Sequence, residues 1–221
     1  AMATIYELYL QHEKQEYASQ AALDTFNEID LLEDELSRFR ESSDISKINA
    51  LAPGESSVVG LATFDCLAHC TDLWQATNQT FDITIGALMR CWLKPDKSLR
   101  NPTDEEIEKA AATVGMMHFE LNESQLTVTN TGAEKLNLDL GGYGKGYAID
   151  QIAELLREWG IESALVNGGQ STLCALDAPE GEDGWRVSIS HPANRQQTLG
   201  QFALENRTLS GSGLERGQHI I

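Results

Sequence analysis

The sequence is poor in positive charge and has no long hydrophobic run. Its 221 residues include 16 Lys and Arg against 34 Asp and Glu, a formal net charge of -18. A nucleic-acid interface needs clustered Lys and Arg, so we exclude a nucleic-acid partner. No window approaches the roughly 20 apolar residues of a membrane-spanning helix, so we expect no transmembrane segment in this chain. The opening AMATIYELYL lacks the basic and apolar regions of an export signal, and we expect none here.

Cysteine is also scarce, and its spacing excludes the common zinc and redox motifs. The four cysteines, Cys66, Cys70, Cys91 and Cys174, include no CxxC pair. His69 lies beside the first two, but there is no second Cys/His pair nearby to complete a tetrahedral zinc site. We therefore interpret Cys66 and Cys70 as buried free thiols. The redox compartment stays open, because the cysteines show no evident pairing.

Hydrophobic periodicity predicts the elements of the N-terminal half. Apolar and polar residues alternate at 4–10, which indicates a strand, and helical spacing indicates amphipathic helices at 17–39 and 60–75. The polar stretch ESSDISKINAL at 41–51 is interpreted as a loop, and Thr103 in TDEE is predicted to cap a short helix. The expected inward faces of the two amphipathic helices are Ala22, Phe26, Ile29, Leu32 and Leu36 in the first, and Leu61, Phe64, Leu67 and Thr71 in the second.

The C-terminal half is predicted to be mostly strands around one helix. The helix covers 147–160, with Ile149, Ile152, Leu156 and Trp159 inward and Gly160 as its C-cap. Strands are expected at 125–130, 135–140, 162–167, 171–176, 185–190 and 200–205. Without strict βαβ alternation, this pattern favours an α+β fold with mixed, mostly antiparallel sheets and packed helices. No repeat or linker is visible, so a single domain over residues 1–221 is expected.

The glycine-rich stretch NLDLGGYGKGYAID, residues 137–150, matches neither common phosphate-binding motif. A P-loop is excluded because Asp139 replaces its first glycine and Gly146 follows Lys145 in place of Ser or Thr. The dinucleotide fingerprint fails because its third glycine comes one residue early. Glycines that expose N–H groups and adopt positive φ before a helix N-terminus still favour an anion. A tight strand–helix turn with a solvated lysine explains the spacing equally well.

Several further motifs follow a fixed order along the chain. They are MAT, LSRFRESSDISKIN, TFDITIGAL, DLGGYGKGYAID, LLREWGIESALVNGGQSTLCAL, WRVSISHP and TLSGSGLERGQHII. In this order they resemble the ApbE-type FAD:protein FMN transferases, and the resemblance covers the whole chain. Several ordered motifs are far more specific than any one of them.

The resemblance implies a T-fold-like α+β architecture and a transferase activity. Family members bind FAD with magnesium and transfer its FMN half to a threonine hydroxyl of a target protein, releasing AMP. Such phosphoryl transfer depends on positioning and charge neutralisation. The resemblance also implies a periplasmic protein or a membrane-anchored lipoprotein. Three alternatives stay open: a non-catalytic flavin-binding protein, an FAD pyrophosphatase giving AMP and FMN, and an α+β interaction module.

The resemblance also implies roles for individual residues. His219, near the isoalloxazine and pyrophosphate, and Ser212 occupy catalytic positions, and the backbone carbonyl of Gly142 is expected to be a magnesium ligand. The residues expected to hold FAD are Met2, Phe39, Thr80, Phe81 and Asp82 for its flavin and adenine parts, and Asp139 and Lys145 for the nucleotide. Alternatively, Phe39 and Phe81 are core aromatics, Asp82 is a helix cap and His219 is an exposed terminal residue.

The chain departs from the family pattern at three positions and at its end. Ala3 replaces a glycine, while Gln170 and Ser212 stand where relatives usually carry aspartate. The sequence ends before the segment in which relatives carry their side-chain magnesium ligands. The remaining ligands are therefore expected beyond Ile221, and we expect any magnesium-dependent step to be inactive in the chain as given.

Overall fold

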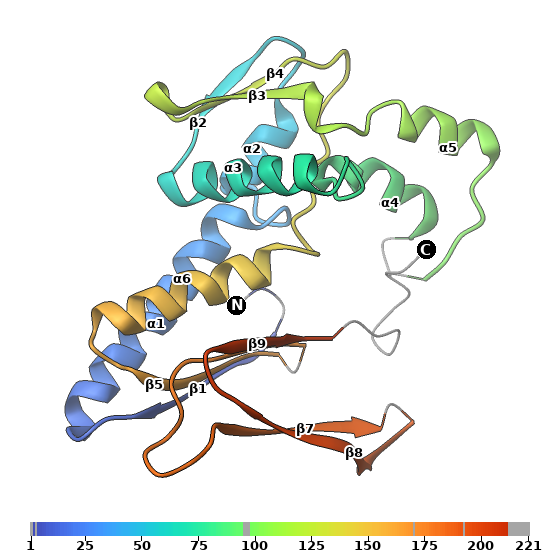
Figure 1. Cartoon of the computed structure of the whole chain (residues 1–221). Helices are drawn as coiled ribbons and strands as arrows, with labels where there is room; N and C mark the ends of the chain where they lie inside the picture. Colours follow the sequence, from blue (N-terminus) through green and yellow to red (C-terminus); the bar gives the residue numbers. More distant parts are fainter. Residues whose placement is uncertain (1, 3, 95–97, 170, 192, 212–221) are drawn as a thin grey trace. The chain divides into compact units, whose positions relative to one another are not determined.

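The computed structural model describes residues 2, 4–94, 98–169, 171–191 and 193–211 (Figure 1). Contacts divide the chain into two compact units. Unit 1 comprises the described residues of 1–31 and 145–215, and unit 2 those of 32–144. Two compact units can belong to one domain or to two, so the single-domain assignment stays a prediction.

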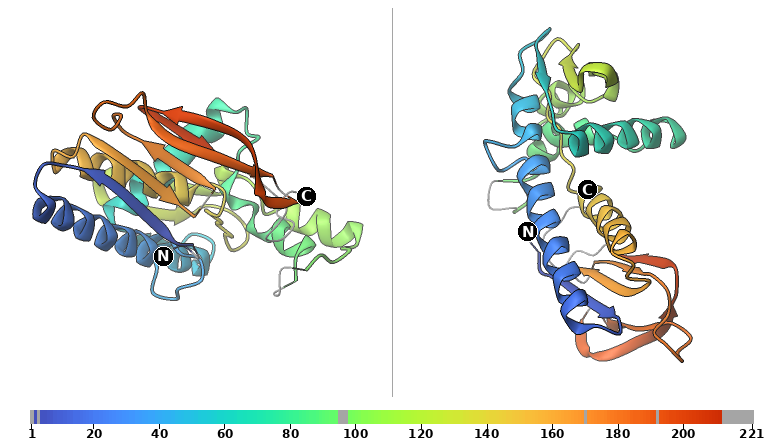
Figure 2. Two further views of the ribbon diagram at one scale, coloured as in Figure 1. Left: turned by 90° about the horizontal axis from the view of Figure 1, so that it is seen from below. Right: turned by 90° about the vertical axis from the view of Figure 1, so that its left-hand side faces the viewer.

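Unit 1 is built on a four-stranded antiparallel sheet in the order β1–β5–β6–β9. Its strands are β1 (Tyr6–Gln11), β5 (Ser163–Gly168), β6 (Thr172–Ala175) and β9 (Arg207–Ser210). Helix α6 (Gly144–Glu158) and the N-terminal part of α1 (Gln15–Leu36) lie side by side on one face, as both views in Figure 2 show. The antiparallel pair β7 (Trp185–His191) and β8 (Asn194–Leu204) packs on the other face.

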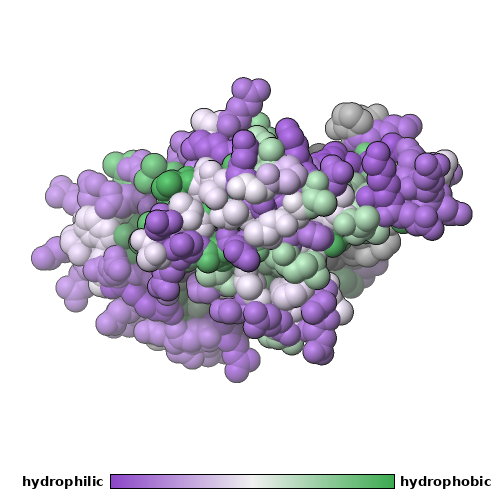
Figure 3. All heavy atoms as spheres, turned by 90° about the horizontal axis from the view of Figure 1, so that it is seen from above, coloured by the Kyte–Doolittle hydropathy of each residue, from purple (hydrophilic) through white to green (hydrophobic). Residues whose placement is uncertain are grey.

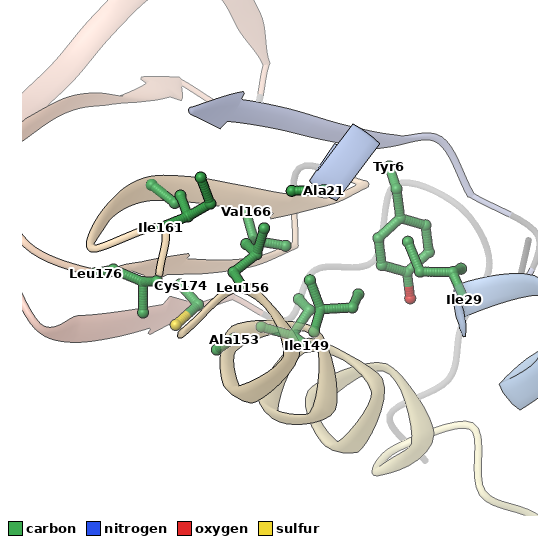
Figure 4. Packing of buried hydrophobic residues seen from close by; sticks show 12 residues of the cluster. Tyr6, Ala21, Ile29, Ile149, Ala153, Leu156, Ile161, Val166, Cys174 and Leu176 are labelled. Carbon is green, nitrogen blue, oxygen red and sulfur yellow. The ribbon is translucent and has the colours of Figure 1, made fainter. Parts of the chain in front are cut away.

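Alternation along β5 gives unit 1 its two hydrophobic layers. Ala164 and Val166 face the helices, where they join Ile149, Ile152 and Leu156 of α6 in one buried cluster (Figure 4). The intervening Leu165 faces the opposite way and packs with residues of β7 and β8. The inward face predicted for α6 is therefore confirmed, although Trp159 is only partly buried. Gly160 has φ 68 and ends the helix, as predicted.

Unit 2 combines a small antiparallel sheet with four short or medium helices. The sheet order is β2–β4–β3, with β2 at Ser56–Val58, β4 at Thr127–Asn130 and β3 at Phe119–Asn122. The helices are α2 (Asp44–Ala50), α3 (Leu61–Ala76), α4 (Gly86–Trp92) and α5 (Asp104–Ala111). Three single 3-10 turns complete it: η1 (Ile83–Ile85), η2 (Met116–His118) and η3 (Glu123–Gln125). Every strand pair among the described residues is antiparallel, which confirms the predicted α+β class.

The buried faces of α1 and α3 differ in part from the predicted faces. In α1, Ile29, Leu32 and Leu36 are buried as expected, but Phe26 is 40% exposed, because the stripe continues through the neighbouring Ala21 and Thr25. In α3, Leu61 at the first turn is 63% exposed, whereas Phe64 and Leu67 are buried. Phe26 lies in the middle of α1 and Leu61 in the first turn of α3. In both helices the packing of the neighbouring turns, not periodicity, sets which side chains are buried.

The loop predicted at 41–51 is wrong, because α2 occupies most of it. Ser43 caps this helix by accepting a hydrogen bond from the N–H of Ser46, and Ile45 and Ile48 are fully buried. Only two large apolar residues mark the helix in a polar sequence. This pattern is too short to show periodicity, so burial in the tertiary structure stabilises the helix. The capping box predicted at Thr103 for α5 is confirmed by reciprocal bonds with Glu106.

Cys66 and Cys70 are fully buried free thiols, as predicted, and Cys91 and Cys174 are free as well. A hydrogen bond with Cys70 and burial together raise the pKa of the Cys66 thiol well above its ordinary value, so it stays protonated. No helix in the described part of the chain is long and apolar enough to cross a membrane. On the face drawn in Figure 3, hydrophilic side chains predominate and hydrophobic ones form scattered patches.

Candidate functional site

Residues 135–140 lead into the glycine loop as an extended segment, and the strand predicted there is wrong. Its three leucines are buried, so the alternation is real. Its partners, however, are not a strand: the N–H of Leu138 donates to Asn49 Oδ1 at 2.6 Å, and Asn49 Nδ2 donates to the Leu138 carbonyl at 3.1 Å. The N–H of Asp139 donates to the carbonyl of Ile83 at 2.7 Å. A side-chain amide and a 3-10 turn thus take the place of a neighbouring strand.

The glycine turn then runs directly into α6. The N–H groups of Tyr143 and Gly144 both donate to the Leu140 carbonyl, at 2.9 and 2.7 Å. None of the four glycines has the positive φ that we expected. A Cβ added at Gly142 or Gly146 would have no atom within 4 Å, so the space beside both residues is open. The loop therefore presents bare backbone at a helix N-terminus, where the helix dipole favours an anion.

The carboxylate of Asp139 is engaged inside unit 2. Its Oδ1 accepts the N–H of Gly141 at 2.9 Å, and its Oδ2 lies 3.4 Å from Nε of Arg38. The same guanidinium has its Cζ 4.5 Å from the centre of the Phe39 ring. Arg38 therefore connects Asp139 with Phe39 by an ion pair and a cation–π contact. Sequence reasoning did not single out Arg38, although it lies inside the motif LSRFRESSDISKIN.

The two aromatic residues assigned to FAD are both accessible. Phe39 is 77% exposed, which excludes the interpretation of this ring as a core aromatic. Phe81 is half-buried and meets the ring of Tyr143 edge to face, with centroids 5.9 Å apart. Tyr143 was not predicted to take part, but it places an aromatic ring within the glycine loop itself.

Asp82 caps a 3-10 turn, in agreement with the alternative interpretation of this residue as a helix cap. Its Oδ1 accepts both the N–H and the hydroxyl of Thr84, at 2.7 and 2.5 Å, at the start of η1. The exposed Thr80 donates its hydroxyl to a backbone carbonyl three residues earlier, at 2.7 Å. Asn78 and Gln79 precede it with φ of 51 and 67, a conformation that non-glycine residues seldom adopt. A tight, irregular turn thus sets the position of Thr80 and Asp82.

Lys145 and Met2 belong to unit 1. Lys145 Nζ donates to Ser171 Oγ at 2.7 Å, so a hydroxyl holds the ammonium group, in contrast to the freely solvated lysine of the alternative interpretation. Ser171 lies in the turn between β5 and β6 and was not predicted to contribute. Met2 packs on the core of this unit, and its Sδ accepts the hydroxyl of Tyr6 at 3.3 Å.

The structure brings together part of the predicted site. Phe81, Asp82, Asp139 and Gly142 gather in unit 2, because residues 80–83 and the glycine loop are joined by hydrogen bonds and ring contacts. The catalytic candidates Ser212 and His219 lie outside the described residues, as do Ala3 and Gln170. Within the described ranges, no three His, Cys, Asp or Glu side chains gather as a metal site. The role of the Gly142 carbonyl as a magnesium ligand therefore stays a prediction.

Solved structures share this fold. The ApbE protein from Thermotoga maritima superposes with a TM-score of 0.81 at 23% identity, over 94% of this chain and 66% of that one. The flavin transferase ApbE from Vibrio cholerae gives a TM-score of 0.80 at 23% identity, over 99% of this chain and 71% of that one. At this identity the likeness establishes the architecture, and it confirms the predicted ApbE-like fold.

Curated relatives are similar in sequence as well. The FAD:protein FMN transferase of Vibrio cholerae is 30% identical over 174 residues, which are 75% of this chain and 49% of that protein. The FAD:protein FMN transferase of Klebsiella pneumoniae is 28% identical, over 84% of this chain and 54% of that protein. The chain thus spans about half the length of the curated relatives it matches. The ApbE family model matches residues 2–219, and the chain therefore belongs to the ApbE family.

Proposed function

We propose that this chain binds FAD and takes part in transferring its FMN half to a threonine hydroxyl of a target protein, with release of AMP. The observation that carries the proposal is the match of the ApbE family model to residues 2–219. The curated relatives that this chain resembles are FAD:protein FMN transferases. The same resemblance supports a periplasmic location or a lipoprotein anchor. We propose these as the setting in which the acceptor protein is met.

Groups within each unit, taken separately, suit parts of a flavin dinucleotide. The exposed Phe39 ring and the Phe81–Tyr143 pair offer apolar faces on which an isoalloxazine or adenine ring can stack. The bare backbone of the glycine loop and the N-terminus of α6 favour the negative pyrophosphate. Lys145, in the first turn of that helix, adds a positive charge.

The proposed chemistry needs little from the protein beyond positioning and charge. The threonine oxygen attacks the phosphorus of the FMN half and forms a new P–O bond. The bond from that phosphorus to the bridging oxygen breaks, AMP leaves with this oxygen, and the threonine proton is released. Negative charge moves onto the leaving phosphate, so Lys145 and the helix N-terminus would stabilise the transition state electrostatically.

Magnesium is the part of the proposal that the described residues fit least. The Asp139 carboxylate is already engaged by Arg38 and the Gly141 N–H, and no three acidic, His or Cys side chains gather among the residues described. We therefore derive no step through the metal. Its requirement is tested by running the reaction with magnesium and with a chelator.

The test combines the protein, FAD and a peptide that carries an acceptor threonine. Mass spectrometry follows FMN on the peptide while chromatography follows AMP, and a peptide with valine in place of the threonine is the control. Flavin on the threonine peptide with matching AMP supports the proposal. AMP with free FMN would instead identify an FAD pyrophosphatase, and retained intact FAD a flavin-binding protein. If no flavin is retained, neither transfer nor binding stands.

A further inference from the structure

We infer that Ser171 is a positioning residue that orients the Lys145 ammonium group towards an anion at the N-terminus of α6. This inference rests on the proposed function, since it takes the anion to be the pyrophosphate of FAD. Ser171 carries no role in the sequence-based assignment. Its contact with Lys145 becomes visible only in the folded chain, because 26 residues separate the two positions.

Ser171 is held through its hydroxyl and through its backbone. Its Oγ accepts a hydrogen bond from the ammonium of Lys145 at 2.7 Å and lies 3.5 Å from the carbonyl of Gly168 at the end of β5. Its own backbone carbonyl accepts the N–H of Gly211, just after β9, at 2.9 Å. The acceptor of the lysine is therefore set by the sheet and not by a free loop.

A fixed hydrogen-bond acceptor lowers the entropy that the lysine side chain loses when an anion binds. The flexible lysine stem loses rotamer entropy when its position becomes fixed. The contact with Ser171 meets part of this cost before any ligand arrives. An ammonium group has three donors, so one bond to Ser171 leaves two for an anion.

The neutral acceptor also preserves the charge. A carboxylate at position 171 would hold Lys145 equally well, but it would cancel the positive charge that an anion needs. A serine hydroxyl orients the ammonium and leaves its full charge available. The Ser171 oxygen accepts from a positively charged donor and its hydroxyl faces the Gly168 carbonyl, so neither contact activates Ser171 as a nucleophile.

The test is a double-mutant cycle on FAD binding, measured by quenching of flavin fluorescence at low and high salt. Ser171→Ala is expected to raise the Kd for FAD about 3- to 10-fold at low salt, and Lys145→Met about tenfold or more. Because Ser171 acts through Lys145, Ser171→Ala should add no effect in the Lys145→Met background. Ser171→Thr should restore affinity, and Ser171→Asp should weaken it more than alanine does.

A matched control is Ser188→Ala, which removes an exposed hydroxyl on β7 that contacts Gln201. It should leave the Kd unchanged. An equal effect of Ser171→Ala with and without Lys145 would overturn the inference, as would an unchanged Kd or flavin attached to Ser171 itself.

A second measurement distinguishes failure of this inference from failure of the proposed function. If the unaltered chain binds no FAD, it is compared by urea unfolding with Ser171→Ala, Lys145→Met and the double variant. A coupling free energy between positions 145 and 171 then supports the orienting contact without a flavin ligand. Absence of coupling overturns the contact itself.

Discussion

Asn49 is the side chain on which the position of the glycine loop should depend most. Its amide both accepts from the N–H and donates to the carbonyl of Leu138, at 2.6 and 3.1 Å. Leu138 is 1% exposed, so its backbone groups have little access to water in the folded chain. Asn49→Ala should leave one buried donor and one buried acceptor unsatisfied. At about 1–3 kcal/mol for each group, the free energy of unfolding should fall by about 2–6 kcal/mol.

Urea unfolding followed by tryptophan fluorescence measures this loss. With an m-value of about 2–3 kcal/mol/M, the midpoint of the variant should fall by about 0.7–3 M. Asn101→Ala removes an exposed amide from the same unit and should change stability by less than about 0.5 kcal/mol. If Asn49→Ala lowers the free energy of unfolding no more than this control does, the two hydrogen bonds between Asn49 and Leu138 do not stabilise the segment. The reasoning on the loop would then fail.

Three further perturbations test other features of the two units. Gly169→Ala should lower the free energy of unfolding by about 1–3 kcal/mol, because Gly169 has φ 73 and an added methyl group would overlap the Thr4 side chain. An unchanged midpoint of urea unfolding would contradict this. Arg38→Met should raise the Kd for FAD in fluorescence titrations more at low salt than at high salt, because both contacts of Arg38 depend on its charge. If the variant binds FAD as tightly as the unaltered chain, Arg38 is not part of the site. Hydrogen bonding to Arg100 lowers the pKa of Glu106, so its stabilisation is present above about pH 4.3 and is lost as pH falls through the folded-state pKa. The difference in Tm between Glu106→Gln and the unaltered chain should therefore vanish in acid, and a constant difference would refute the assignment.

Local patterns determined several elements of this protein from sequence alone. The capping box of α5 and the Gly160 end of α6 were predicted correctly, because each depends on residues within one turn. The strand expected at 162–167 corresponds to β5, whose consecutive apolar residues serve both faces of the sheet. The ordered motifs also indicated the family, because each motif is a short run of residues whose identity and order do not depend on how the chain folds.

Only the tertiary structure decided which groups serve as partners across long distances. Residues 135–140 have a strand pattern, but alternation cannot show that Asn49 and Ile83 supply the hydrogen bonds in place of a strand. The contacts of Arg38 with Asp139, and of Lys145 with Ser171, likewise depend on how separate elements meet. A sequence records which side chains are available, whereas folding determines which of them come within hydrogen-bonding distance.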